Sequence, residues 1–245
     1  MCLKIEEGAI FISDSHDNDK RDGFYRFLQK IDSKEIETSQ LFLMGDMFDL
    51  LFGGVSYTIK KQQKEIDLLN RLSKKMEIFY FEGNHDFGLK EIFPNIKVFT
   101  IESQPVLFSI KDKYILLSHG DKYGDSVHRV YTKLIRNRTI LGILNFVDSV
   151  FGNFISRRLE EELGRKKICT EIESFEEIIE KKLEKYRVKK GSIIAEGHYH
   201  QNRKFRFMDI EYINFSSFAC NQSYFIVQLS SDVKFTEKKV RGCDV

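Results

Sequence analysis

The sequence predicts an α/β (α+β) fold, a β-rich scaffold interrupted by a helical insertion, and three observations support this prediction. Short apolar runs alternate with amphipathic helical segments early in the chain, as in βαβ units that build a mainly parallel sheet. Strand periodicity is missing between about residues 123 and 186 and resumes afterwards. Clusters of Asp, His and Asn follow apolar runs on both sides of this block. We therefore assign residues 1–122 and 187–245 to a core and residues 123–186 to the insertion.

Hydrophobic periodicity places each expected element. Strands are expected at 9–13, 40–44, 77–81, 97–101, 105–110 and 114–118, and helices at 20–32 and 60–75. The first helix is predicted from apolar residues that recur every three or four positions, namely Phe24, Phe27, Leu28 and Ile31. Beyond the insertion, strands are expected at 192–196, 204–207, 210–214 and 224–229. We expect residues 211–239 to close a second sheet and to carry no chemistry.

The composition is that of a folded soluble protein, with 42% hydrophobic and 31% charged residues among 245. A chain of this length can bury a sizeable core within one domain. Its formal net charge of +2 argues against a surface devoted to nucleic acid, whose phosphates select basic proteins. We therefore expect neither nucleic acid nor an obligate protein as a partner.

The cysteines and the N-terminal residues bear on the cellular compartment. Cys2, Cys169, Cys220 and Cys243 are scattered without a CxxC pair, which predicts reduced thiols rather than a disulfide framework or a zinc knuckle. Residues 1–8 are charged and short, so no signal peptide is expected. No run approaches the roughly 20 apolar residues that span a bilayer. A cytoplasmic location is expected, with peripheral membrane contact left open.

Five polar clusters stand at the ends of expected strands. They are Asp14-Ser15-His16, Gly45-Asp46-Met47-Phe48-Asp49, Gly83-Asn84-His85-Asp86, Ser118-His119-Gly120-Asp121 and Gly197-His198-Tyr199-His200. Residues i and i+2 of an extended chain face the same side, so two ligands at this spacing can share one ion. Each cluster alone is an ordinary turn. Their joint occurrence is informative because they contain every histidine of the chain except His128, and because ligand sites in α/β sheets gather at the carboxyl ends of strands.

The order DxH, GDxxD, GNHD, HGD and GHxH between residues 10 and 200 resembles the calcineurin-like metallophosphoesterase superfamily. The resemblance implies a four-layer αββα sandwich around a dinuclear metal centre. It implies one metal on Asp14, His16 and His200, a second on Asn84, His119 and His198, and Asp46 as the bridge between them. It also implies that His85 contacts the phosphoryl or leaving group, with Asp49 supporting His85. Asn84, His85 and His198 are further expected to contact the substrate.

The chemistry of this ligand set agrees with the resemblance. The ligands offer oxygen and imidazole nitrogen without thiolate, and they are too many for one ion but suit two. Such a mixture favours Mn²⁺, Fe or Zn²⁺ over Cu(I). Two metals roughly 3.5–4 Å apart can hold a bridging water, lower its pKa and clamp phosphoryl oxygens during in-line attack. The sequence therefore predicts a hydrolase of phosphate esters.

The helical block suggests which ester is cleaved. Residues 140–155 are strongly apolar and have basic flanks, so the block is expected to form a lid that holds acyl chains and meets anionic lipid. A helical hairpin packed on the core, with a solvated basic face, is the structural alternative. Arg157 and Arg165 are expected to contact the substrate on the basis of their charge.

This arrangement is similar to that of the UDP-2,3-diacylglucosamine diphosphatases of lipid A synthesis. The similarity implies Mn²⁺-dependent attack of water on UDP-2,3-diacylglucosamine, which releases UMP and 2,3-diacylglucosamine 1-phosphate (lipid X). It also implies a substrate contact at Asp125, just after the HGD motif, and peripheral attachment at the cytoplasmic face of the inner membrane. The chain departs from the best-known branch of that family in having GNHD in place of GNRD.

Three other functions stay open from the sequence. The first is a phosphoesterase that acts on soluble nucleotides or other phosphodiesters. The second is a nuclease, against which the lack of an extended basic groove or aromatic platform argues. The third is a non-catalytic scaffold with a decayed site, against which the presence of every expected ligand argues.

Overall fold

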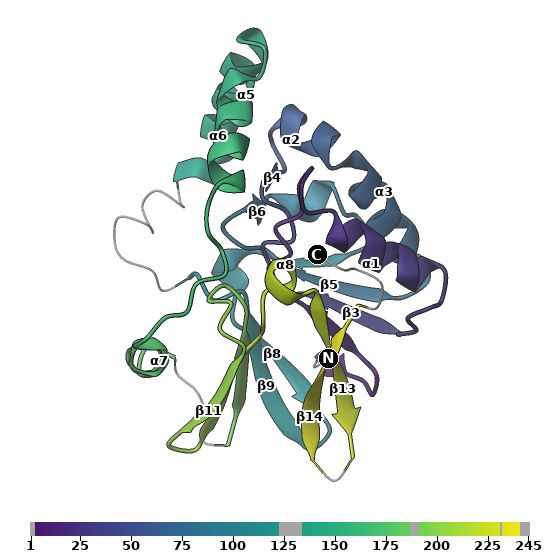
Figure 1. Ribbon diagram of the computed structural model, residues 1–245, viewed down its shortest axis with the longest axis vertical. Coiled ribbons are helices and arrows are strands. Elements are labelled where there is room, and N and C mark those ends of the chain that lie inside the picture. The colour runs from purple at the N-terminus through teal and green to yellow at the C-terminus, as the bar shows by residue number, and fades with distance from the viewer. Residues whose placement is uncertain (1–2, 123–133, 187–190, 231, 241–245) are drawn as a thin grey trace.

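Two six-stranded sheets, each with parallel and antiparallel neighbours, form the centre of the molecule (Figure 1). A computed structural model describes residues 3–122, 134–186, 191–230 and 232–240. The first sheet runs, in spatial order, β1 (Leu3–Ile5), β8 (Val106–Ile110), β9 (Lys113–Ser118), β10 (Ile193–Glu196), β12 (Ile210–Asn214) and β11 (Arg203–Phe207). The second runs β14 (Val233–Lys239), β13 (Ser223–Leu229), β2 (Ile10–Ile12), β3 (Gln40–Leu43), β5 (Glu77–Phe81) and β7 (Lys97–Phe99).

An aromatic core lies between the two sheets. The rings of Phe11 and Phe42 stack with their centroids 4.2 Å apart, and those of Phe42 and Phe79 stack at 4.6 Å. Phe108 of the first sheet meets Phe42 and Phe79 edge-on. Because β2 and β3 are buried on both faces, their sequences are continuous apolar runs instead of an alternation of apolar and polar residues.

Helices cover the outer face of each sheet. The helices α1 (Gly23–Asp32) and α3 (Gln63–Leu72) pack on the second sheet through residues such as Phe27 and Leu69. On the other side, α7 (Phe175–Leu183) packs on the first sheet through Phe175 and Ile179 (Figure 1). The order helix, sheet, sheet, helix confirms the expected four-layer sandwich.

Several short elements join these layers. They are β4 (Leu51–Phe52), α2 (Ser56–Lys61), β6 (Asp86–Phe87), the 3₁₀ turns η1 (Leu89–Glu91) and η2 (Ile101–Ser103), and α8 (Phe218–Asn221). The single helix expected at 60–75 is replaced by α2 and α3, because Gln62 adopts φ −102° and ψ 19° between them. The parallel pair of β4 and β6 ties the loop after β3 to the loop after β5.

The described part of the insertion contains a helical hairpin. The strongly apolar residues 140–155 belong to two helices, α5 (Arg138–Val150) and α6 (Phe154–Gly164), which meet at an angle of 100°. Gly152 and Asn153 turn the chain in the left-handed region, and Asp148 accepts hydrogen bonds from the backbone at the start of α6. The hairpin projects from the body of the molecule (Figure 1). Residues 123–133, which include Asp125, lie outside the described residues.

Two of the four cysteines are paired in the structure. The prediction of reduced thiols is wrong for Cys169 and Cys220, which form a disulfide. They are 51 residues apart in the sequence, so tertiary packing against α8 creates a pair that cysteine spacing does not reveal.

Within the described ranges, no single helix is long and apolar enough to cross a membrane, although α5 and α6 together pass that test as a bent pair.

Candidate metal centre

The five polar clusters converge at one edge of the sandwich. They follow the carboxyl ends of β2, β3 and β5 in one sheet and of β9 and β10 in the other. The neighbouring pairs β2–β3, β3–β5 and β9–β10 are parallel, so their carboxyl ends point the same way. The strand topology therefore brings together side chains that lie up to about 190 residues apart in the sequence.

The first group of candidate ligands is Asp14, His16 and His200, whose ligand atoms all lie within 4.8 Å of one another. His200 Nε2 lies 3.1 Å from Asp14 Oδ1. Its other ring nitrogen, Nδ1, lies 2.7 Å from the backbone oxygen of Ile168. This contact holds the ring with Nε2 directed at Asp14, as backbone carbonyls commonly do for metal-binding histidines.

The second group is Asp46, His119 and His198, again with all ligand atoms within 4.8 Å. His119 Nε2 lies 3.3 Å from Asp46 Oδ2, and His119 Nδ1 lies 2.9 Å from the backbone oxygen of Met44. Asp46 also forms a third such group with His16 and His85. Asp46 thus stands between the two halves of the site, as the expected bridging residue would.

Buried polar atoms show that this cage suits cations. Among the described residues, His16 Nε2 and Asn84 Oδ1 are buried without a hydrogen-bond partner, a costly state unless another ligand supplies the contact. The cage is also closed at its backbone. A Cβ at Gly83 would overlap the carboxylate of Asp46, and one at Gly45 would overlap the ring of His119. The donor set and its dense packing fit two divalent ions.

The backbone of the ligand residues is strained. Asp14, His16, Asp46, His198 and His200 all have positive φ values, between 44° and 64°. Residues other than glycine seldom occupy this left-handed region, and such strain concentrates at functional sites. The surrounding fold therefore holds these side chains at a conformational cost, which is consistent with their converging on a ligand.

Charge coupling dominates the protonation of the cage. Burial would raise the pKa of Asp14, but the imidazoles of His200 and His119 outweigh it and lower that pKa to about 2. Burial would also raise the pKa of Asp46, but the neighbouring imidazoles of His119 and His85 outweigh burial and hold that pKa well below its usual value. Burial and the neighbouring His119 lower the pKa of His198 to about 4. The two carboxylates are thus anionic and His198 is neutral, as metal binding requires. Burial opposes protonation of His119 and His200, but Asp46 and Asp14 outweigh it and raise the pKa of these two imidazoles, so a bound cation would have to displace their protons.

The carboxylate of Asp49 lies beside His16 and not beside His85, which corrects the role expected for it. Asp49 Oδ1 is 3.3 Å from His16 Nδ1, and Asp49 Oδ2 accepts a hydrogen bond of 2.6 Å from Arg21. His85 Nδ1 instead lies 2.9 Å from the backbone oxygen of Asp49. The side chain of Asp49 therefore orients His16, a candidate metal ligand, and the backbone oxygen of Asp49 orients His85.

Sequence reasoning missed several residues that support the cage. Asp86 accepts hydrogen bonds from the backbone of Gly83, Asp46 and Met47 and from the Tyr80 hydroxyl. It therefore fixes the GDxxD loop against the GNHD loop. The acid that ends GNHD was a signal in the sequence, but its partners depend on how the two loops pack.

Gln104 and Lys182 support the HGD loop from outside the motifs. Gln104 Oε1 accepts a hydrogen bond of 2.6 Å from the backbone of His119. Lys182, on α7, donates to the backbone oxygen of Gly120 at 2.7 Å and to Glu196 at 2.6 Å. Neither residue belongs to a recognisable pattern, so only the tertiary structure could identify them.

A cavity of about 310 Å³ opens over the metal centre. Asn84, His85 and His198, the expected substrate contacts, line it together with Lys166 and Lys167. Arg157 and Arg165 do not line this cavity; both are exposed on or just after α6, and Arg165 lies 3.8 Å from Glu161. The basic residues at the cavity are thus the two lysines that follow α6. Asp125 lies outside the described residues.

Arg136 connects the insertion to the metal centre. Its Nη2 donates a hydrogen bond of 2.6 Å to the backbone oxygen of Gly83, the residue before Asn84. Its side chain is 9% exposed, and its guanidinium lies over the ring of Phe87. The acids Glu82 and Asp121 approach it at 3.8 and 4.0 Å. The chain therefore enters α5 directly from a contact with the GNHD loop.

A buried cage of carboxylate, amide and imidazole ligands at the carboxyl ends of strands in an αββα sandwich defines a metallophosphoesterase. The family model for calcineurin-like phosphoesterases matches residues 9–209. The chain belongs to the calcineurin-like phosphoesterase family.

Curated relatives share part of this sequence. UDP-2,3-diacylglucosamine hydrolase of Pseudomonas putida is 28% identical over 157 residues, which cover 62% of this chain and 65% of that protein. The match thus spans slightly less than two thirds of that relative's length. The enzyme of the same name from Stutzerimonas stutzeri is 25% identical over 199 residues, covering 78% of this chain and 81% of that one. Among solved structures, a phosphoesterase from E. coli has a TM-score of 0.45 and 12% identity over 95% of this chain and 99% of that one.

Proposed function

We propose that this protein hydrolyses the pyrophosphate of UDP-2,3-diacylglucosamine to UMP and 2,3-diacylglucosamine 1-phosphate. One observation carries the choice of substrate: an exposed apolar hairpin contacts the GNHD loop at one end and leads into the metal cavity at the other. Arg136, just before α5, contacts the GNHD loop, and Lys166 and Lys167, just after α6, line the cavity. The names of the relatives from Pseudomonas putida and Stutzerimonas stutzeri support the same substrate.

The hairpin is unusually apolar for an exposed element. Phe146, Phe151 and Phe154 are 70%, 69% and 67% exposed, and Val150 and Ile143 are 64% and 59% exposed. A contiguous patch of this kind marks a surface that meets lipid or another apolar ligand. We assign it to the acyl chains of the substrate and to the surface of the membrane that supplies them. The proposal therefore includes a cytoplasmic protein attached peripherally to the inner membrane.

The residues of the site divide the chemistry between them. Asp14, His16 and His200 would hold one ion, Asn84, His119 and His198 the other, with Asp46 between them. Two such ions, which we propose to be Mn²⁺, would polarise the phosphoryl group and lower the pKa of a shared water. Water adds to the α-phosphorus of the UDP moiety, and the bond from that phosphorus to the bridging oxygen breaks.

His85 and the lysines act on the phosphates. The contact of His85 Nδ1 with the backbone oxygen of Asp49 leaves Nε2 available to the cavity. A protonated Nε2 donates a hydrogen bond to oxygen that gains negative charge in the transition state. Lys166 and Lys167 supply positive charge at the cavity wall, where they attract the pyrophosphate.

Release of UMP from two nucleotide sugars tests the proposal. The protein loaded with Mn²⁺ is expected to release UMP from UDP-2,3-diacylglucosamine and not from UDP-N-acetylglucosamine. Asp46→Asn, which removes the candidate bridging carboxylate, is expected to abolish turnover. Equal turnover of the two nucleotide sugars would contradict the lipid substrate and favour a phosphoesterase of soluble nucleotides.

A further inference from the structure

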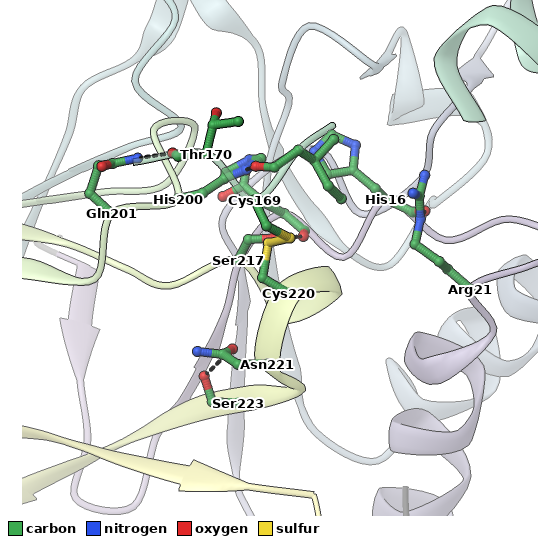
Figure 2. Close-up of a disulfide and its surroundings, with 12 residues drawn as sticks. His16, Arg21, Cys169, Thr170, His200, Gln201, Ser217, Cys220, Asn221 and Ser223 are labelled. Atoms are coloured by element: carbon green, nitrogen blue, oxygen red, sulfur yellow. Dashed lines mark hydrogen bonds and ion pairs between the residues drawn. A yellow bond between two sulfur atoms is a disulfide. The ribbon is translucent and has the colours of Figure 1, made fainter. Parts of the chain in front are cut away.

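The disulfide between Cys169 and Cys220 links two segments, each of which contacts a candidate metal ligand through hydrogen bonds (Figure 2). Cys169 follows Ile168, whose backbone oxygen contacts His200 Nδ1 at 2.7 Å. Cys220 lies on α8, and the N-terminal end of α8 contacts the backbone of the DxH motif. The side chains of Asp14 and His200 face each other at 3.1 Å. The covalent bond therefore spans the outside of one half of the metal centre.

Among the described residues, the other contacts of the segment that carries Cys169 are made with the first sheet and the loops around it. Between α6 and α7, residues 167–172 form neither helix nor strand. Gln201 accepts a hydrogen bond from the backbone of Ile172 at 2.8 Å and donates one to the backbone oxygen of Thr170 at 3.0 Å. These contacts are made with the segment that carries His198 and His200. The disulfide adds a connection to a different part of the fold.

The helix α8 is firmly attached to the other ligand. Phe218 and Ala219 donate backbone hydrogen bonds of 2.8 and 3.2 Å to the backbone oxygens of Ser13 and Asp14. The hydroxyl of Ser217 donates a bond of 2.7 Å to the backbone oxygen of Asp14. Cys220 is therefore fixed relative to Asp14, and the disulfide transfers that fixed position to Cys169 and the adjacent carbonyl of Ile168.

We propose that the Cys169–Cys220 disulfide is a positioning bond for His200 and that its reduction selectively weakens one of the two metal sites. With the bond intact, the carbonyl of Ile168 accepts a hydrogen bond from Nδ1 of His200 and keeps Nε2 directed at the ion shared with Asp14. Without it, the segment around Cys169 loses its covalent link to α8 and the ring loses its fixed orientation. The inference rests on the metal centre of the proposed function and does not depend on the substrate.

Thiol chemistry can break this bond in the folded protein. Cys169 is exposed, so a dithiol reductant can reach it. One thiolate of the dithiol attacks a protein sulfur and releases the other cysteine as a thiol. The second thiolate then displaces the first protein sulfur, which leaves two protein thiols and an oxidised, cyclic dithiol. Two electrons and two protons pass from the dithiol to the protein.

Metal affinity in the two redox states tests the inference without any substrate. The metal-free wild-type protein is titrated with Mn²⁺ by calorimetry, once oxidised and once after reduction by a dithiol that is removed anaerobically. We expect the affinity for one of two Mn²⁺ ions to fall by about 10- to 100-fold, as for loss of other outer contacts to a ligand. The affinity for the second ion should stay unchanged, and reoxidation should restore the first.

Matched variants separate positioning from general loosening of the fold. Cys169→Ser/Cys220→Ser should have the weakened site in both redox states, whereas Cys2→Ser/Cys243→Ser should respond to reduction as the wild type does. Equal affinities in the oxidised and reduced wild type would overturn the inference, and so would an equal loss at both ions. If the double variant fails to fold, the reduced wild type decides.

The result can be distinguished from a failure of the proposed substrate. A protein that loses one Mn²⁺ on reduction and yet cleaves no UDP-lipid supports the positioning bond and contradicts only the substrate. A protein that binds no Mn²⁺ in either state overturns the metal centre and the positioning bond together.

Discussion

At the scale of single residues, the metal centre depends on contacts made one step away from the ligands. Asp86 ties two ligand loops together, Asp49 orients His16, and the backbone oxygens of Met44 and Ile168 orient His119 and His200. Each of these contacts selects which ring nitrogen, or which rotamer, faces the centre. The candidate ligands are therefore positioned by contacts within the fold itself.

Arg136 offers a residue-scale prediction. Arg136→Met removes a buried hydrogen bond to Gly83 and the guanidinium that approaches Glu82 and Asp121, so we expect a loss of about 1–3 kcal/mol in the free energy of unfolding. Arg138→Met is the matched control, because Arg138 is 87% exposed and pairs with Glu91 at the surface. Such a pair contributes about 0–1 kcal/mol. Denaturant unfolding in the presence of a chelator measures both values, and equal losses would contradict the role assigned to Arg136.

The ligand types were predictable from the sequence, but their supporting contacts were not. Asp14, His16 and His200 stand out because histidines are few and recur beside acids at strand ends. The positive φ values of these residues could not be read from the sequence, because most Asp and His residues still have negative φ even though these types tolerate the left-handed region better than most. Asp49 supports His85 through its backbone oxygen and not through its carboxylate, which contacts His16 and Arg21. The sequence did not reveal this arrangement because Arg21 lies outside every motif.

At the scale of elements, strands and helices differed in how well their sequences marked them. The strands β2, β3 and β5 were recognisable because largely buried strands are continuous apolar runs. Their predicted ends agree with the observed ends to within about two residues, the usual uncertainty of boundaries placed from sequence. The apolar run 140–155 carried no predicted boundary between helices, whereas Gly152 and Asn153 separate α5 from α6 within it. Periodicity does not reveal such a break because both halves keep their apolar character.

The α5–α6 hairpin carries an element-scale prediction. Phe146→Ser/Phe151→Ser/Phe154→Ser should raise KM for UDP-2,3-diacylglucosamine at least tenfold, because each phenyl group buried against acyl chains contributes about 1.5–3 kcal/mol. Turnover of bis-p-nitrophenyl phosphate, which has no acyl chain, should be unchanged. Met208→Ser is the control, since Met208 is 80% exposed and lies in the turn between β11 and β12. Equal effects on both substrates would show that the hairpin serves only the fold.

At the scale of the whole molecule, the fold places five strand ends from two sheets at one edge. The four-layer sandwich could be predicted because the motif order and the alternating periodicity agree over most of the chain. The disulfide could not be predicted, because Cys169 and Cys220 meet only after α8 has packed beside the DxH motif. Local patterns thus determine the layers, and the long-range contacts complete the site.

Buried acids outside the ligand set predict how stability depends on pH. Glu65 on α3 is fully buried, and burial raises its pKa above the usual 4.5. Burial, followed by the charge of Glu65, raises the pKa of Asp17 to about 8. A raised pKa means that the folded state prefers the protonated acid. This stability is complete below the unfolded-state pKa and is lost as the pH rises through the folded-state pKa.

Glu65→Gln should therefore stabilise the fold selectively at higher pH. We expect its melting temperature to match the wild type near about pH 4 and to exceed it near about pH 8, by about 2–4 °C for each kcal/mol gained. Asp67→Asn, at an exposed position of the same helix, should show no such trend. Thermal unfolding with a chelator present, at both pH values, makes the comparison. A constant difference between Glu65→Gln and the wild type across this range would contradict the assignment.

The central claim is that seven side chains from five strand ends hold two ions. An anomalous difference map from crystals soaked in Mn²⁺ tests it most directly. We predict two peaks, one in contact with Asp14, His16 and His200, the other with Asn84, His119 and His198, and Asp46 touching both. The absence of peaks at these side chains, or a single peak that excludes Asp46, would contradict a centre of two ions bridged by Asp46.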